Sequence, residues 1–212
     1  MNSSLLGLAL LPEESARRRL VNFRSALNEF LDEPELGIET SIPHVSVLQC
    51  PFAANALTED KLGSLVAQFR AGGSANVRQA TLGRLYHQPR DWIFVETIFD
   101  SWILGLQNLA ITLLESEIDR DSIDLDRDFE GYTTAEARNF KTYGYRYVGE
   151  SFRPHITLGR RPSAGDGSLP AQLMSAYARE LKGSVVTFDQ MVFYRAGAYG
   201  SLAQILAEVS ID

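Results

Sequence analysis

The chain has a single cysteine in 212 residues, so no disulfide can form within it. A protein without structural disulfides suits a reducing compartment. Cys50 follows an apolar run, which is typical of a small buried hydrophobic residue rather than of a nucleophile. We therefore expect stability to come from a hydrophobic core, which a chain of this length can bury.

Long apolar runs are also lacking. The apolar stretch 5–11 is too short to cross a bilayer, no positive residue precedes it, and Pro12-Glu13-Glu14 follows at once. These flanks differ from those of a signal peptide. We predict a buried first strand here, and a cytoplasmic protein with no membrane contact.

A basic excess is missing: 20 lysines and arginines stand against 27 acidic residues, for a net charge of −7. This argues against a protein that coats long nucleic acid, but it leaves room for a small pocket that binds one phosphate. Acidic residues concentrate in 115–130 and basic residues in 138–161. Either run can also be simply a solvated surface.

Apolar periodicity predicts helices alternating with strands, some in hairpins, and hence an α+β class or an α/β class with mixed sheets. The predicted helices cover 13–31, 58–72, 102–118 and 169–181, with a short helix after a capping box of Thr133 and Glu136. The predicted strands cover 5–11, 42–48, two strands within 77–99 around a turn at 88–91, 152–158, 185–194 and 202–211. A further turn is expected at 165–167. No low-complexity linker divides the chain, so we expect one domain over 1–212, either a single large body or two small, closely packed lobes.

Histidine is scarce, yet two of the three histidines share one sequence pattern. Residues 42–47 read Ile-Pro-His-Val-Ser-Val, and residues 153–158 read Arg-Pro-His-Ile-Thr-Leu. Both contain proline, histidine, an aliphatic residue, a hydroxyl residue and a second aliphatic residue in that order. Proline makes up only about 5% of residues in proteins, so chance is a poor explanation for the repeat.

Alternate side chains of a strand share a face, so each motif presents an imidazole beside a hydroxyl and turns its aliphatic residues to the other side. His44 would lie beside Ser46, and His155 beside Thr157. A single motif of this kind is most often an ordinary half-buried strand. Two matched copies favour one shared cleft.

Two imidazoles and two hydroxyls suit phosphodiester chemistry without a metal or cofactor. Histidine titrates near neutrality, with an unperturbed pKa of about 6.5. One neutral imidazole can take a proton from water while the other, protonated, donates to the leaving oxygen. The hydroxyls can hold the non-bridging phosphate oxygens. The sequence does not indicate which histidine is the acid and which the base.

The two motifs resemble those of the 2H phosphoesterase superfamily, named for paired His-x-Ser/Thr-aliphatic motifs, and within it the 2′-5′ RNA ligase-like (LigT-like) cyclic phosphodiesterases. The order of elements is similar, and the second motif histidine follows the first by 111 residues. The resemblance implies two pseudo-symmetric lobes, with mostly antiparallel sheets lining a central groove and helices outside. It also implies a catalytic tetrad of His44, Ser46, His155 and Thr157, with Arg160 as a phosphate or substrate contact.

The same resemblance implies hydrolysis of 2′,3′-cyclic phosphates of RNA ends or nucleotides. Two departures from the family pattern, in the run 49–52 and in the longer, acidic segment 119–147, leave the substrate open. One alternative is therefore a phosphodiesterase of a cyclic oligonucleotide or another non-RNA substrate. Another is a module that binds RNA or nucleotides on this fold without relevant catalysis. We expect a monomer with no obligate protein partner.

Further substrate contacts are weaker predictions. Tyr143, Tyr145 and Tyr147 would share one face, and could stack on a base, if that stretch is extended. Phe52 and Arg153 flank the motifs and are also candidates, with Tyr86 a lesser one.

Three other patterns carry less weight. His87 lacks a hydroxyl residue two positions later and is interpreted as a surface histidine. The histidines show none of the tight spacings of a zinc site, so we predict no metal. The run 126–131 resembles the start of a calcium loop but has Ala137 at the twelfth position, so we interpret it as a solvated loop or a lid over the groove.

Overall fold

The computed structural model describes residues 3–31, 35–53, 56–72, 78–88, 92–161 and 170–210. The helices are α1 (Glu14–Ser25), α2 (Glu59–Gly72), α3 (Trp102–Leu114), α4 (Thr134–Tyr143) and α5 (Ala171–Glu180). The strands are β1 (Ser3–Pro12), β2 (Val45–Ala53), β3 (Arg78–Gln88), β4 (Trp92–Phe99), β5 (His155–Arg160), β6 (Val185–Ala196) and β7 (Leu202–Ser210). Short 3₁₀ turns cover η1 (Glu115–Glu117), η2 (Arg120–Ser122), η3 (Gly149–Ser151) and η4 (Ala198–Gly200).

The predicted elements occur, but several bounds were wrong. The first helix ends at Ser25 instead of at 31. The buried Arg24 guanidinium donates to Asn28 Oδ1 (2.6 Å) and to the Leu31 carbonyl (3.1 Å). These bonds hold the residues after the helix in turns. The third helix ends at Leu114 and continues only as a 3₁₀ turn. The tips of the predicted turns, 89–91 and 165–167, lie outside the described residues.

Both motif strands begin later than predicted, at Val45 and at His155. Each start follows the motif proline closely. Proline has no N–H to donate to a sheet, so it is found before or at the start of a strand. The two histidines therefore stand where the strands begin.

The strands form one antiparallel sheet in the order β1-β2-β5-β4-β3-β6-β7, and β6 also pairs with β1. That extra pairing closes six strands into a barrel, with β7 attached outside the circuit through β6. One lobe contains β1, β2, β7 and the C-terminal half of β6. The other contains β3, β4, β5 and the N-terminal half of β6, which pairs with β3 through Val185–Phe188. The predicted α+β class, with mostly antiparallel strands, is confirmed.

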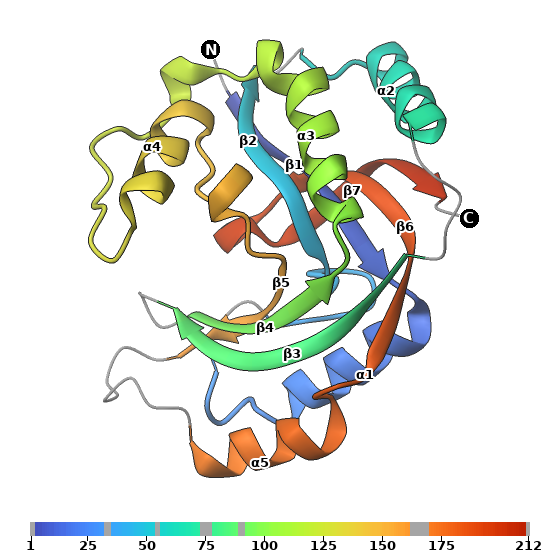
Figure 1. Ribbon diagram of the computed structural model, residues 1–212, viewed down its shortest axis with the longest axis vertical. Coiled ribbons are helices and arrows are strands. Elements are labelled where there is room, and N and C mark those ends of the chain that lie inside the picture. The colour runs from blue at the N-terminus through green and yellow to red at the C-terminus, as the bar shows by residue number, and fades with distance from the viewer. Residues whose placement is uncertain are drawn as a thin grey trace.

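The helices lie outside the sheet, on both lobes. Figure 1 shows α1 and α5 side by side below β3 and β4, and α2 and α3 at the opposite end of the molecule. Phe23 of α1 and Tyr177 of α5 are in ring contact, with centroids 5.8 Å apart. Among the helices described, none combines the length and apolar character that crossing a bilayer requires.

The two motif strands touch through one residue pair, Val45 of β2 opposite Ile156 of β5. Beyond this pair no other strand joins that edge of β2 among the described residues, and an isolated bridge links Phe52 to Ile118. Gln107 of α3 bonds between these two points: Nε2 donates to the carbonyls of Val47 (2.9 Å) and Tyr147 (2.8 Å). Gln107 Oε1 accepts from the Gly149 N–H (2.9 Å). This fully buried side chain thus joins β2 to the segment 147–149.

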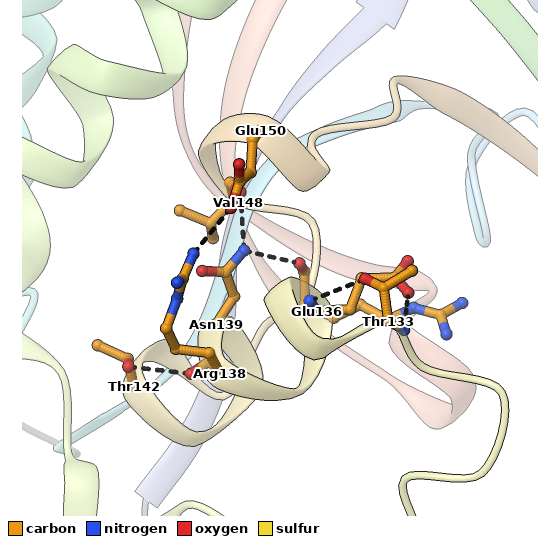
Figure 2. Close-up of polar contacts among 8 residues, drawn as sticks. Thr133, Glu136, Arg138, Asn139, Thr142, Val148 and Glu150 are labelled. Carbon is orange, nitrogen blue, oxygen red and sulfur yellow. Dashed lines mark hydrogen bonds and ion pairs between the residues drawn. The ribbon is translucent and has the colours of Figure 1, made fainter.

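Helix α4 holds the start of the same segment. The predicted capping box is confirmed, since the Glu136 N–H donates to Thr133 Oγ1 (3.2 Å) and the Thr133 N–H donates to Glu136 Oε2 (2.8 Å). Asn139 Nδ2 donates to the carbonyls of Arg146 (3.3 Å) and Val148 (2.8 Å), as Figure 2 shows for the Val148 contact. The segment 146–149 is therefore held from two helices.

Candidate active site

A pocket of about 800 Å³ opens between the two lobes. Its volume is in the range of small-molecule sites. Its walls include side chains from both motifs, from the acidic segment, from the loop before β2 and from the η4 turn. All four predicted motif residues line it: His44, Ser46, His155 and Thr157.

The strand register explains why these four side chains meet. Val45 and Ile156 are opposite each other, and both side chains are fully buried in the core. In an antiparallel pair, the residues on either side of such a pair point to the opposite face. The four motif side chains therefore share the pocket face, with each histidine close to the other motif's hydroxyl. The junction has a local pseudo-twofold axis.

Both imidazoles are oriented by the same contact. His44 Nδ1 lies 2.7 Å from the Ile42 carbonyl oxygen, and His155 Nδ1 lies 2.6 Å from that of Arg153. A carbonyl oxygen can only accept, so each Nδ1 carries a hydrogen. In the neutral ring Nε2 is then unprotonated and can accept a proton.

Burial lowers the pKa of both histidines. The pKa of His155 falls to about 4: removal from water has the largest effect, the bond to the Arg153 carbonyl opposes it, and the charges of Arg146 and His44 add to the decrease. The pKa of His44 is also lowered by burial, against the effect of its bond to Ile42. Both imidazoles are therefore mainly neutral at pH 7.

Two rows of rings extend from His155. In one, Phe94 stacks on His155 with centroids 4.0 Å apart, Trp92 stacks on Phe94 (6.4 Å) and Tyr199 meets Trp92 edge-on (5.7 Å). This row is entirely aromatic. Tyr199 is 58% exposed and has a left-handed backbone, with φ 59°, which is uncommon for a residue other than glycine and is often found at functional sites.

The second row contains arginine. Tyr147 lies edge-on to His155 (5.2 Å), and the Arg146 guanidinium lies over the rings of both Tyr147 (4.5 Å) and Tyr132 (4.6 Å). Arg146 also hydrogen-bonds the Tyr147 hydroxyl. The sequence indicated only a basic run here, and nothing in it singled out Arg146 as a pocket residue.

On the other side of the tetrad, a hydrogen-bond chain ends at Ser46. Gln49 Nε2 donates to the Tyr194 hydroxyl (2.7 Å) and to the Gly200 carbonyl (3.2 Å), and Tyr194 Oη lies 3.2 Å from Ser46 Oγ. Since the Gly200 oxygen can only accept, the amide nitrogen of Gln49 must face it and donate to Tyr194. The Tyr194 hydrogen is then available to Ser46, whose own hydrogen can point into the pocket.

Gly7 makes it possible for the Tyr194 hydroxyl to reach Ser46. It stands opposite both Gln49 and Tyr194 in the sheet, so the Tyr194 ring crosses β1 to reach β2. A Cβ at Gly7 would lie 2.4 Å from Tyr194 Cε1, closer than atoms can approach. A glycine inside the apolar run 5–11 was the one available sequence signal, since such a glycine often marks a close approach.

The other predicted contacts divide into two groups. Arg160 and Tyr145 line the pocket. Phe52 is 2% exposed and lies in the core. Arg153 is exposed, and its carbonyl oxygen accepts a hydrogen bond from His155. Neither residue belongs to the pocket lining. His87, interpreted as a surface histidine, is half-buried in β3, as is Tyr86.

The stretch 143–147 is not extended, so the condition under which Tyr143, Tyr145 and Tyr147 would share one face is not met. Helix α4 runs through Tyr143, and Gly144 ends it in the left-handed conformation with φ 69°. Tyr143 is therefore separated from the two tyrosines that line the pocket. The strong capping box at the start of α4 is local, and it gave no sign of how far the helix continues.

The acidic segment forms part of the pocket wall through Ser122, Ile123, Asp124 and Arg127, so it is more than a solvated loop. In the described ranges, no three or more His, Cys, Asp or Glu side chains gather in a way that could hold a metal ion.

Comparison with protein-family models finds no match, and comparison with curated proteins finds no relative. Solved structures with the same fold do exist. TT0787 of Thermus thermophilus has a TM-score of 0.61 at 18% identity, covering 98% of this chain and 97% of that one. Escherichia coli LigT complexed with 3′-AMP has a TM-score of 0.56 at 14% identity, covering 99% and 98%. A structure described as a phosphoesterase has a TM-score of 0.53 at 14% identity, covering 98% of each. The chain therefore has the fold of the LigT-like 2H phosphoesterases.

Proposed function

We propose that this protein is a phosphodiesterase that hydrolyses cyclic phosphodiesters, with 2′,3′-cyclic phosphates of RNA ends or nucleotides as its substrate class, and that it needs no metal. The observation that carries the proposal is the Val45–Ile156 register, which turns His44, Ser46, His155 and Thr157 into one pocket. The matching carbonyl contacts of the two imidazoles support it, because they leave both Nε2 atoms free for proton transfer.

In the proposed reaction, the Nε2 of one neutral imidazole accepts a proton from water as the water oxygen attacks phosphorus. The other imidazole, protonated, donates its Nε2 proton to the ester oxygen as the P–O bond breaks. The charge of an entering phosphate favours this protonated form, and so counteracts the effect of burial on its pKa. Ser46 and Thr157 donate to the non-bridging oxygens, and Arg160 at the pocket wall adds a positive charge.

A nucleotide ligand fits both the pocket and the neighbours. The LigT structures include complexes with 3′-AMP, with ATP and with NADP⁺. In the present chain, the row of Phe94, Trp92 and Tyr199 offers ring surfaces for a base beside the tetrad.

Two other functions remain as alternatives. A phosphodiesterase of a cyclic oligonucleotide or another non-RNA substrate would use the same four side chains. A module that only binds RNA or nucleotides would have no use for two imidazoles with free Nε2 atoms, and the matched orientation of the histidines disfavours it.

The test is turnover in the presence of a chelator. Purified protein is offered 2′,3′-cyclic nucleotides, 2′-5′ dinucleotides and cyclic oligonucleotides, and products are separated by chromatography. We expect turnover of the 2′,3′-cyclic nucleotides that resists the chelator and falls at least about a hundredfold in His44→Ala and in His155→Ala. His87→Ala, which changes the histidine outside the pocket, should keep wild-type activity. Full activity in either motif variant would contradict the mechanism, and binding without turnover would favour the module.

The pH dependence gives a second measurement on the same protein. For an acid–base pair, kcat/KM follows a bell whose limbs report the pKa values of the free protein. Burial lowers the pKa of both histidines, that of His155 to about 4, so both limbs shift to lower pH. We expect the optimum of kcat/KM below about pH 6.5, the ordinary histidine value. An optimum above pH 7, or a monotonic profile, would contradict this.

A further inference from the structure

Arg127 is an arginine in an acidic segment that does not pair with its acidic neighbours. Its guanidinium lies over the Phe140 ring, 4.8 Å from the centroid, and the residue lines the pocket. Its Nε is buried without a hydrogen-bond partner, and no ion pair reaches it from the residues that the structure describes. By contrast, Arg120 of the same segment pairs with Glu115 at 3.3 Å.

Arg146 is the neighbouring cation on this wall. It lies between the rings of Tyr132 and Tyr147, and it hydrogen-bonds Gln88 Oε1 (3.4 Å). Over the described part of the chain, Arg146 likewise has no acidic partner. Asp124 also lines the pocket, but among the described residues it is not bonded to either arginine. In a protein with a net charge of −7, these two arginines give one wall of the pocket a positive charge that no acidic side chain of the described residues neutralises.

The aromatic contacts order these groups along the wall. Tyr147 contacts His155, Arg146 contacts Tyr147 and Tyr132, the Tyr132 and Phe140 rings lie 6.3 Å apart, and Arg127 lies over Phe140. Arg146 is thus one ring from the tetrad, and Arg127 is farther along the same wall. The ring faces and the hydrogen bonds of Gln107 and Asn139 to the segment 146–149 hold this wall in place.

We infer that Arg127 and Arg146 form a second anion subsite, which binds a phosphate of the substrate other than the one at the tetrad. The inference rests on the proposed function, because it places the second phosphate relative to the reacting one. Guanidinium groups bind phosphate through paired N–H donors. Within the described part of the chain, no hydrogen bond engages the donors of Arg127. The preferred substrate therefore carries a phosphate on the 5′ side of the terminal nucleoside, as a monoester or as the link to a preceding nucleotide.

Equilibrium binding tests the subsite without requiring turnover. Calorimetry would compare adenosine 3′-monophosphate with adenosine 3′,5′-bisphosphate, and then with a 3′-phosphorylated diadenosine that carries the second phosphate as a diester. We expect the wild-type protein to bind the two-phosphate ligands about tenfold more tightly, the effect of one charge-assisted contact. Comparing the bisphosphate with the diadenosine ligand shows whether a free nucleotide or an RNA end is the better source of the second phosphate.

The matched variants are Arg127→Gln and Arg120→Gln, two neutralised arginines of one segment. In Arg127→Gln the ratio of the two dissociation constants should fall to below about threefold, whereas Arg120→Gln should keep the wild-type ratio. Thermal unfolding checks that both variants fold. On the wild-type protein alone, the ratio should also shrink as NaCl is raised, because salt screens the added charge contact.

The inference is overturned if the wild-type protein shows no preference for a second phosphate, if Arg127→Gln keeps the preference, or if salt leaves the ratio unchanged. These outcomes are separate from the failure of the proposed function. Loss of the preference in Arg127→Gln supports the subsite even in a protein without turnover. Chelator-resistant turnover with equal binding of all three ligands would leave the proposed reaction in place and remove the subsite.

Discussion

At the scale of single residues, the two motif histidines are oriented alike but have different surroundings. His44 packs against Tyr194, with centroids 5.3 Å apart, and Tyr194 belongs to the polar chain that ends at Ser46. His155 lies between Phe94 and Tyr147, close to the Arg146 charge. The pseudo-twofold symmetry therefore holds for the motifs themselves but not for the side chains around them. The two imidazoles are not equivalent, so we expect them to take different roles in proton transfer.

The polar chain leads to a prediction for Tyr194→Phe. The variant keeps the ring against His44 but removes the hydroxyl that orients Ser46, so we expect kcat to fall about three- to tenfold with little change in KM. A hydroxyl that orients Ser46 toward the transition-state oxygens should affect kcat, and initial-rate kinetics separates the two constants.

Tyr177→Phe is the matched control. It also removes a buried hydroxyl, one that donates to the Gly83 carbonyl (2.9 Å) away from the pocket, so it should leave kcat unchanged. A wild-type kcat in Tyr194→Phe, or an equal loss in both variants, would contradict a positioning role for Tyr194.

At the scale of elements, α3 contributes a buried polar residue where β2 and β5 separate. Gln107 bonds to three backbone groups, the carbonyls of Val47 and Tyr147 and the N–H of Gly149. Without it, these groups would lose their partner away from water. The apolar periodicity of 102–118 predicted the helix, but it could not show that a polar side chain of that helix is buried, because the partners come from other elements.

We expect Gln107→Leu to destabilise the protein by about 3 kcal/mol, because it leaves buried backbone groups without hydrogen bonds. Urea unfolding should show a lower midpoint with an unchanged slope. Gln68→Leu is the control, since Gln68 is exposed on α2 and, within the described ranges, bonds only to Ser64. It should change stability by less than about 0.5 kcal/mol. Equal stability of the two variants would show that the Gln107 bonds contribute little.

At the scale of the whole molecule, β6 joins the two lobes. It pairs with β1 and β7 along its C-terminal half and with β3 at its N-terminal end. The main hydrophobic cluster also extends across both lobes, from Leu8 and Leu48 to Leu82 and Leu158. Separating the lobes would therefore break sheet hydrogen bonds and expose the core.

We accordingly expect the chain to unfold in one cooperative transition, as proposed for a single domain over 1–212. Differential scanning calorimetry should give a calorimetric enthalpy equal to the van't Hoff enthalpy. Two resolved transitions would mean that the lobes fold independently.

Monomeric behaviour also remains a prediction, and sedimentation at several protein concentrations checks it.

The sequence by itself determined the features that depend on near neighbours along the chain. The alternation of a strand put His44 with Ser46 and His155 with Thr157, and both prolines preceded the strands. The capping box started α4 where predicted. Such features depend on spacings of two to four residues, which the chain carries in its own geometry.

Only the tertiary structure decided which distant side chains join the motifs. Tyr194 reaches Ser46 because β6 pairs with β1 across Gly7, and Arg127 faces the pocket because its segment packs on α4 through Phe140. Both depend on strand pairing and core packing between segments far apart in sequence. No local pattern encodes such contacts, because their free energy comes from burying surfaces that meet only in the folded chain.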